Sequence, residues 1–187
     1  LCQDRRSMTN TVQAPGLAAG QIGALTPSEI TTLGAPATAL AALSTAELRG
    51  LKTSQISALG AAIGALSATQ IAHLTITQVR ALTATGIAAL SFTQIAALSV
   101  QHVANMGAGQ IGALSSRQIA QFTAAQLAAL SAAQVKELST AAIAALSTGQ
   151  IQGLTPAALR GLGSAQIAAL TTTQIWAMST AQFGAIG

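Results

Sequence analysis

The chain has 187 residues and a net charge of +4, from 8 basic and 4 acidic side chains. Hydrophobic residues make up 51% of it but aromatic residues only 2%, and charged residues make up 6%, against about 25% in an average soluble domain. The length suffices for one domain with a sizeable core, while so few charges predict a surface of Ser, Thr, Gln, Ala and Gly. The single cysteine, Cys2, excludes an intrachain disulfide and a cysteine metal cluster.

The N-terminal segment, residues 1–17, fits the pattern of the rest of the chain only weakly. Its first ten residues, LCQDRRSMTN, carry charge, and no apolar segment of the kind found in secretory signals follows them. We expect residues 1–17 to form an N-terminal arm or cap.

From residue 18 to the end, the chain is a repeat of eight residues. Fifteen octads run without a gap from Ser67, among them SFTQIAAL (91–98) and TAAQLAAL (123–130). Thirteen of them begin with Ser or Thr and eleven have Gln in the fourth place, while the fifth and eighth places are apolar in every octad. Two irregular units, of ten residues (34–43) and seven residues (60–66), interrupt the earlier part, and we expect them to bend or re-phase the array. A short fixed period of this kind is typical of a repeat architecture.

Each octad has the pattern of a short capped helix. A Ser or Thr followed three residues later by Gln or Glu is a capping box, in which the hydroxyl and the longer side chain satisfy each other's backbone N–H groups. Glu29 and Glu47 take the box position in two early octads, and Pro27 and Pro156 stand at the first helical position, where proline is well tolerated. Each octad therefore predicts a cap followed by about two helical turns.

A single continuous helix does not fit this period. Eight residues advance an α-helix by about 800°, so the apolar pair of each octad would rotate by about 80° from the last and form no common face. A β-solenoid is disfavoured because its strands alternate with period two, which the letters I-A-A-L do not. We expect the chain to turn at every cap, with places five and eight pointing into a shared core and two or so helices in each superhelical turn. The predicted fold is an all-α solenoid of short helices over residues 18–187.

The C-terminal octad, STAQFGAI, has the same pattern as the others. A solenoid usually carries a polar cap on its last repeat, whereas here Phe183 and Ile186 would have nothing over them. Either the chain is a piece of a longer array, or these two residues form an assembly end through which copies of the chain join end to end, as a homo-oligomer or filament.

Few residues could carry chemistry. His73 and His102 occupy different places of their octads, and His102 stands where Gln usually stands, which favours a cap-like or surface hydrogen bond. The acidic residues, Asp4, Glu29, Glu47 and Glu137, form no general acid–base pair, and no Asp–His pair activates a serine. We therefore predict that the chain is not an enzyme and has no catalytic, metal or cofactor-binding residues.

Membrane insertion and nucleic-acid binding are both disfavoured. Residues 81–116 contain no charged side chain, but polar residues interrupt them, and a membrane span needs roughly 18 mainly apolar residues. The basic residues are spread over many octads, whereas binding to phosphates needs dense charge. Those within the array are Arg49, Lys52, Arg80, Arg117, Lys136 and Arg160. We predict no transmembrane span. As a candidate function, we rank nucleic-acid binding third, after a structural role and the binding of a partner protein.

A column of glutamines is the most regular polar feature. Either each Gln only completes its own capping box, or the set forms a ladder on the surface that contacts a protein, a glycan or a neighbouring fibre. The glutamines are Gln70, Gln78, Gln94, Gln110, Gln118, Gln126, Gln134, Gln150, Gln166, Gln174 and Gln182.

The octads resemble the L-[ST]-x-x-Q-[IV]-x-A-L repeat arrays of very large bacterial exoproteins related to adhesion or haem utilisation; TTTQIWAM (171–178) is one example. The resemblance covers about residues 18–187 and implies a secreted or surface-exposed part that acts as a spacer or fibre. It transfers no catalytic residue, and the chain has no haem-binding motif. We expect a non-catalytic scaffold, stalk or self-assembling fibre outside the bacterial cell or on its surface. The alternative is an intracellular or effector-type solenoid that binds a partner protein.

Overall fold

The computed structural model describes residues 24–34 and 37–186, so the expected arm of residues 1–17 lies outside the described part. The described residues form short helices and no strand. Their bounds are α3 (Pro27–Gly34), α4 (Ala37–Ala41), α5 (Thr45–Arg49), α6 (Thr53–Leu59), the 3-10 helix η1 (Gly60–Ala65), α7 (Ala68–Ala72), α8 (Ile76–Ala81), α9 (Ala84–Ala88), α10 (Phe92–Ala96), α11 (Val100–Asn105), α12 (Ala108–Gly112), α13 (Ser116–Ile119), α14 (Ala124–Ala128), α15 (Ala132–Lys136), α16 (Thr140–Ala145), α17 (Thr148–Gly153), α18 (Pro156–Leu159), α19 (Ser164–Ala168), α20 (Thr172–Ala177) and α21 (Thr180–Phe183). The prediction of an all-α solenoid with one short helix per octad is confirmed.

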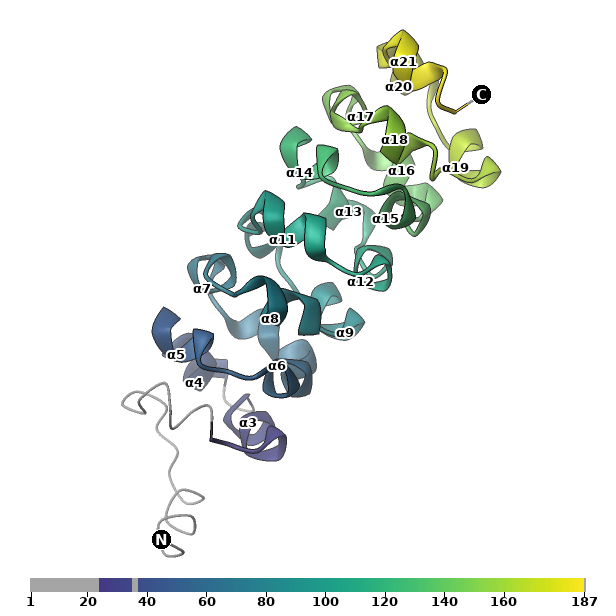
Figure 1. The fold of residues 1–187 in the computed structure, drawn as a ribbon. Coiled ribbons are helices and arrows are strands. Elements are labelled where there is room, and N and C mark those ends of the chain that lie inside the picture. The colour runs from purple at the N-terminus through teal and green to yellow at the C-terminus, as the bar shows by residue number, and fades with distance from the viewer. Residues whose placement is uncertain (1–23, 35–36, 187) are drawn as a thin grey trace, which may run out of the picture.

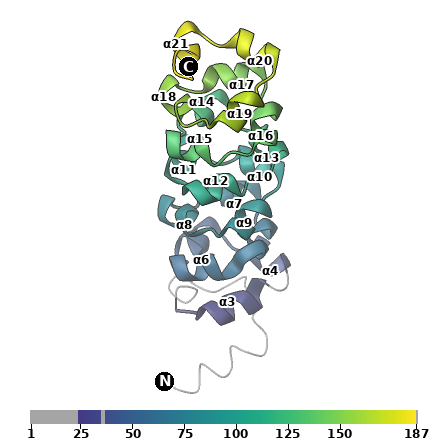
Figure 2. The same cartoon turned by 90° about the vertical axis from the view of Figure 1, so that its right-hand side faces the viewer.

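The helices stack into an elongated superhelix that rises from the N-terminal to the C-terminal end (Figures 1 and 2). Most α-helices have four to six residues, so they are shorter than the two turns that the sequence pattern predicts. Isolated helices of this length are unstable in water. Their stability must therefore come from stacking on one another.

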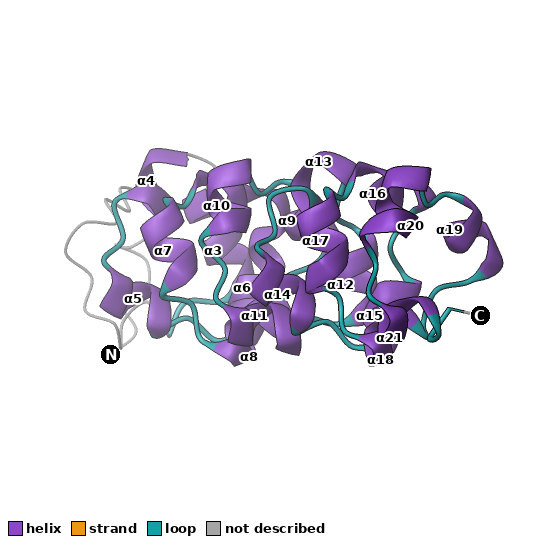
Figure 3. Cartoon of the chain, turned by 90° about the horizontal axis from the view of Figure 1, so that it is seen from above, coloured by secondary structure: helices purple, strands orange, loops and turns teal. Residues whose placement is uncertain are grey.

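Each superhelical turn contains three units, where the sequence analysis predicted about two. Helices that pack on one another are third neighbours along the chain, such as α10 with α13, α13 with α16, and α16 with α19. The connection from α8 to α9 consists of two extended residues, Leu82 (φ −61°, ψ 132°) and Thr83 (φ −75°, ψ 161°), and the connection from α16 to α17 is of the same kind. A link this short turns the chain through a corner but does not reverse it, so three corners are needed to close a turn. Figure 3 shows the same elongated stack of short helices from above.

The irregular units do not disturb this order, so the expected re-phasing is wrong. The seven-residue unit forms η1, which packs on α4 before it and α9 after it, and α3 packs on α6 across the ten-residue unit. Each irregular unit therefore counts as one side of a turn. The seven-residue unit is one residue shorter than an octad. The chain accommodates this at Gly60, which has φ +49°, a backbone conformation that favours glycine.

One continuous apolar core runs along the axis, as predicted from places five and eight. From Ile71 to Leu159, every place-five side chain is fully buried, and the place-eight side chains of the same octads are nearly so. Each octad therefore supplies two residues to a core that it shares with the turns before and after it. This arrangement gives the nearest-neighbour stability that is typical of repeat proteins.

Two glycines at place seven lie in close contact with the helix one turn earlier. A Cβ atom added to Gly161 would lie 2.0 Å from the carbonyl oxygen of Ala132, and one added to Gly153 would lie 2.9 Å from the Cα of Ala124. In both pairs, place seven of one helix meets place two of the helix one turn earlier. At Gly153 and Gly161 the backbones are therefore close enough that only glycine fits without a shift.

Candidate functional site

The column of place-four residues is the most extensive polar feature of the described structure. Ten of the eleven predicted glutamines are buried, and only Gln150 is half-buried. The prediction of a surface ladder is therefore wrong about where these side chains lie. They do recur at regular spacing, but inside the stack.

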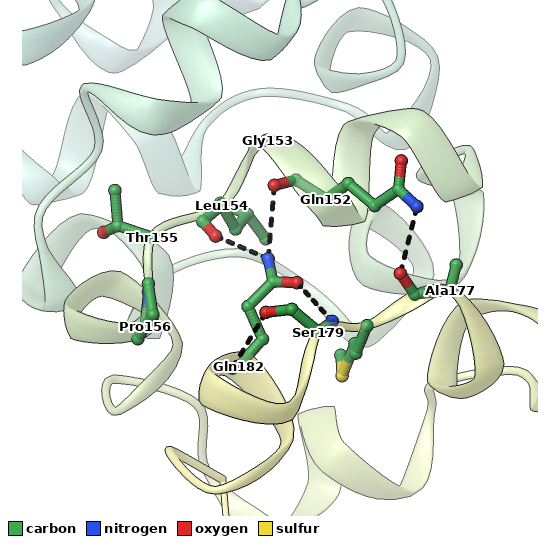
Figure 4. Close-up of a pocket in the computed structure, with 9 residues that line it drawn as sticks. Gln152, Gly153, Leu154, Thr155, Pro156, Ala177, Ser179 and Gln182 are labelled. Carbon is green, nitrogen blue, oxygen red and sulfur yellow. Dashed lines mark hydrogen bonds between the residues drawn. The ribbon is translucent and has the colours of Figure 1, made fainter.

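Each buried glutamine makes two kinds of hydrogen bond, as Figure 4 shows for Gln182. Its Oε1 accepts from the backbone N–H of Ser179 (2.9 Å), while its own N–H donates to the hydroxyl of Ser179 (3.2 Å), which completes the capping box. Its Nε2 donates to the carbonyl oxygens of Ile151 (2.9 Å) and Leu154 (2.7 Å). The capping-box alternative is therefore correct for Oε1. The bonds of Nε2 to another helix are additional to it.

The acceptors of Nε2 are always carbonyls at the C-terminal end of the helix four units earlier. Gln134, for example, donates to Val103 (2.9 Å) and Met106 (2.8 Å). The last carbonyls of any helix have no partner within that helix. Because three units make a turn, the corner that begins one helix lies over the corner that ends the helix four units back. A single glutamine thus satisfies the N-terminal end of its own helix and the C-terminal end of the helix four units earlier. We call this arrangement the glutamine clamp.

The clamp satisfies the side-chain amides that the described core buries. Every buried side-chain nitrogen or oxygen of the described residues has a hydrogen-bond partner. Unpaired polar atoms in such a site would each cost about 1–3 kcal/mol. The glutamine column is therefore a structural element that joins the layers.

His102 replaces glutamine in one unit and reproduces the clamp. Its Nδ1 accepts from the N–H of Ser99 (3.3 Å), so Nε2 carries the proton and donates to the carbonyl of Leu74 (2.9 Å). Burial lowers the pKa of His102 below its ordinary value of 6.5, and the bond to Leu74 opposes that shift in part. The predicted cap-like hydrogen bond is correct, but the side chain is buried and does not lie at the surface.

Three other units have no clamp, because Gly86, Ala142 and Ala158 occupy place four. Gly86 has a clear reason: an added Cβ would lie 3.0 Å from the carbonyl of Gly60, the residue at which the seven-residue unit begins. Nothing in the structure explains the alanines at the other two positions.

The charged residues do not gather into a site. Lys136 lies on α15 and Arg160 directly follows α18, which is stacked on α15, whereas Arg80 lies on α8 in a different column. Two units per turn would place Lys136 and Arg160 on different faces, whereas three units per turn bring them together. Above and below this pair, Gly112 and Gly184 take the same place, so the positive stripe stops after two residues. In residues 24–34 and 37–186, no three His, Cys, Asp or Glu side chains are grouped so that they could hold a metal ion.

The predicted assembly end is exposed at the C-terminal layer. Phe183 is 57% exposed, while Ile186 is partly buried against the core. The layer also exposes Ile175 (38%) and Trp176 (84%), which the sequence analysis missed. With three units per turn, the last three units have no helix over them, so place five becomes exposed in more than the final octad.

No described helix is long and apolar enough to span a bilayer.

The chain was compared with known protein families, curated proteins and solved structures. The comparisons with curated proteins and with solved structures gave no match. The model of the ALTTAQ repeat family matches residues 38–76, 103–140, 124–156 and 143–180, which together make up more than half of the chain. The described structure shows what these segments share, namely short capped helices that three-unit turns stack around one core. The chain belongs to the ALTTAQ repeat family.

Proposed function

We propose that this chain is a non-catalytic structural repeat protein, a scaffold or stalk that holds other elements at a fixed separation. The observation that carries the proposal is the glutamine clamp, which ties most units to the unit four places earlier along a continuous core. Pulling the ends apart would break core contacts and clamps together, layer by layer. Such a stack suits a stiff spacer.

The proposal places this scaffold outside a bacterial cell or on its surface. It is supported by the resemblance of the octads to the repeat arrays of bacterial exoproteins and by a surface that depends little on charge. We also propose that the C-terminal layer, with Phe183 and Ile186, is the end through which the scaffold is joined to another element.

Electron microscopy of the purified chain across a concentration series tests the scaffold function. We expect straight rods of uniform length and width in dilute samples, because every turn repeats the same packing. Small-angle X-ray scattering should give an elongated particle of the same length. Flexible or globular particles would contradict a spacer role.

A second candidate function is binding of a partner protein along the side of the stack. Ile76 (38% exposed) and Val100 (39% exposed) lie at place two of α8 and α11, which pack on one another. Two adjacent apolar side chains on stacked helices would suit a partner with a matching apolar edge. If this row binds a partner, the I76S/V100S double variant should lose the complex that the wild-type chain retains.

A further inference from the structure

His102 is a titratable group inside the clamp column, and it ties α11 to the end of α7. Its Nδ1 accepts from the backbone N–H of Ser99 (3.3 Å), and its Nε2 donates to the carbonyl of Leu74 (2.9 Å), which lies between α7 and α8. The two bonds together need a neutral ring, because both nitrogens of a protonated ring are donors. This clamp is therefore complete only while His102 is unprotonated.

The surroundings of His102 offer nothing that would offset a positive charge. Its side chain is only 5% exposed. Its helix, α11, packs on α8 and α14, and the clamp reaches the end of α7. On these elements, and on α10 and α12 before and after α11, the other titratable or charged groups are His73, which follows α7, and Arg80 on α8, while residues 48–136 include no acidic side chain. A protonated His102 would therefore be a buried charge without a counter-charge, which is strongly unfavourable.

The turn that contains His102 has few other clamps. Of its three units, α9 has Gly86 at place four and makes no clamp, while α10 has Gln94, which donates to a carbonyl of η1 (3.0 Å). Protonation of His102 would leave Gln94 as the remaining clamp of this turn. The level of α11 is therefore the place where a proton would weaken the stack most.

A second turn, α16 to α18, provides an internal comparison. It also has one clamp, at Gln150, because Ala142 and Ala158 occupy place four of the other two units. Both alanines are neutral and buried, so the number of clamps in this turn does not change with pH. The two turns thus separate the effect of a buried charge from the effect of a missing clamp.

We propose that His102 makes the level of α11 an acid-sensitive joint, which opens in mildly acidic solution while the units beyond α14 stay stacked. Opening would separate the start of α11 from the end of α7 and expose core side chains such as Val103, which is fully buried in the closed stack. The inference goes beyond the scaffold function and does not depend on it, because it concerns how one level of the stack responds to protons.

The pH range of the joint follows from the difference between the open and closed states. Burial lowers the pKa of His102 in the closed stack, so the open state binds the proton more readily. Opening should therefore be rare above the ordinary histidine pKa of about 6.5. Below that value, it should become up to about tenfold more frequent for each pH unit, until the pKa of the closed state is reached.

Hydrogen–deuterium exchange of the full chain at pH 7.5 and pH 5.5, corrected for the intrinsic effect of pH on exchange, tests the joint. We expect the amides of α7, α8 and α11 to lose protection by up to about tenfold at the lower pH, and those of α16 to α18 to keep theirs. The variant H102Q has a clamp that does not titrate, so it should keep its protection at both pH values. H73Q, a change at an exposed histidine, is the matched control and should behave as the wild type does.

A further variant, H102A, separates the charge from the clamp. It removes the clamp without adding a charge, so its protection at α7 to α11 should be reduced equally at both pH values. The inference is overturned if the wild type loses no protection at α7 to α11, if H102Q loses as much as the wild type, or if protection falls equally at α16 to α18. Straight rods at neutral pH would support the scaffold function under any of these results, so the two proposals fail separately.

Discussion

At the scale of single residues, the glycines of this chain fall into two groups with opposite roles. Gly161 lies at place seven against the backbone of Ala132, whereas Gly149 lies at place three of α17 with nothing within 4 Å of an added Cβ. Both are small residues in the same repeat pattern. Their contacts differ because Gly161 faces the helix one turn earlier, whereas Gly149 faces open space.

Replacing Gly161 with alanine should therefore destabilise the stack, and Gly149→Ala should not. An added Cβ only 2.0 Å from a carbonyl oxygen forces the backbone to move, which costs about 1–3 kcal/mol or more. Alanine at the open helical position should instead stabilise by about 0.5–1 kcal/mol. Urea unfolding followed by circular dichroism measures both. Equal midpoints for the two variants would contradict the packing assigned to place seven.

His102 makes the stability of the stack depend on pH. Its pKa is lowered in the folded chain, so the unfolded chain binds the proton more readily. Folding stability is then complete above the ordinary pKa of about 6.5 and falls as the pH drops through that value toward the folded pKa. Protonation would also place a hydrogen on Nδ1. Two N–H donors, that of Nδ1 and that of the Ser99 backbone, would then face each other.

The variant H102Q should remove this loss of stability, because the amide makes the same two bonds and does not titrate. Thermal unfolding of the wild type and of H102Q between pH 7.5 and pH 5 measures the effect, with H73Q, a change at an exposed histidine, as the control. We expect the wild type and H73Q to lose stability in parallel and H102Q to lose less. A parallel loss in all three proteins would show that His102 is not the titrating group.

At the scale of the helix and its cap, glutamine and glutamate are interchangeable in the capping box but not in the clamp. Gln134→Glu keeps the acceptor for the Ser131 N–H and replaces Nε2 with an oxygen that faces the carbonyls of Val103 and Met106. An uncompensated buried charge typically costs about 3–5 kcal/mol. We expect a loss of that order in chemical unfolding, while Glu47→Gln changes stability by much less. A mild effect of Gln134→Glu would mean that the clamp adds little to the cap.

At the position that faces the seven-residue unit, we do not expect the commonest residue of the repeat to be the most stabilising one. Glutamine is the usual residue at place four, but a Cβ added to Gly86 would lie 3.0 Å from the carbonyl oxygen of Gly60, which would have to move by a few tenths of an ångström. Gly86→Gln should therefore lower the unfolding midpoint, although it restores the repeat pattern. H102Q, which restores the same pattern away from the irregular unit, should not lower it at neutral pH. The opposite ranking would remove the explanation given for this glycine.

At the scale of the whole molecule, stability should decline toward the C-terminal layer. The exposure of the place-five side chains rises from none at Leu159 to 38% at Ile175 and 57% at Phe183, because these units have neighbours on one side only. In a repeat array, each unit is stabilised mainly by the units it contacts. The loss of neighbours therefore reduces local stability.

Hydrogen exchange at backbone amides measures this gradient. We expect strong protection from α8 to α16, and exchange that becomes faster through α19, α20 and α21. Amides in adjacent units of the interior should exchange at similar rates, because their packing is the same. Uniform protection up to Phe183 would show that the last layer is already covered, for instance by association with another molecule.

The sequence alone determined the helical unit, its caps and the two core positions, because these depend on contacts within eight residues. Ser or Thr at place one, Gln at place four and the apolar pair at places five and eight are enough to place both ends and the buried face of each helix.

Only the tertiary structure decided the number of units in a turn, and several conclusions depended on that number. Two units per turn would place Lys136 and Arg160 on different faces and would leave the glutamine amides without a layer to reach. With three units, the two cations are stacked, the amides meet the carbonyls four units back, and Ile175 becomes exposed at the end. The angle of the corner between helices sets this number. That angle arises from how whole layers pack, and no single octad encodes it.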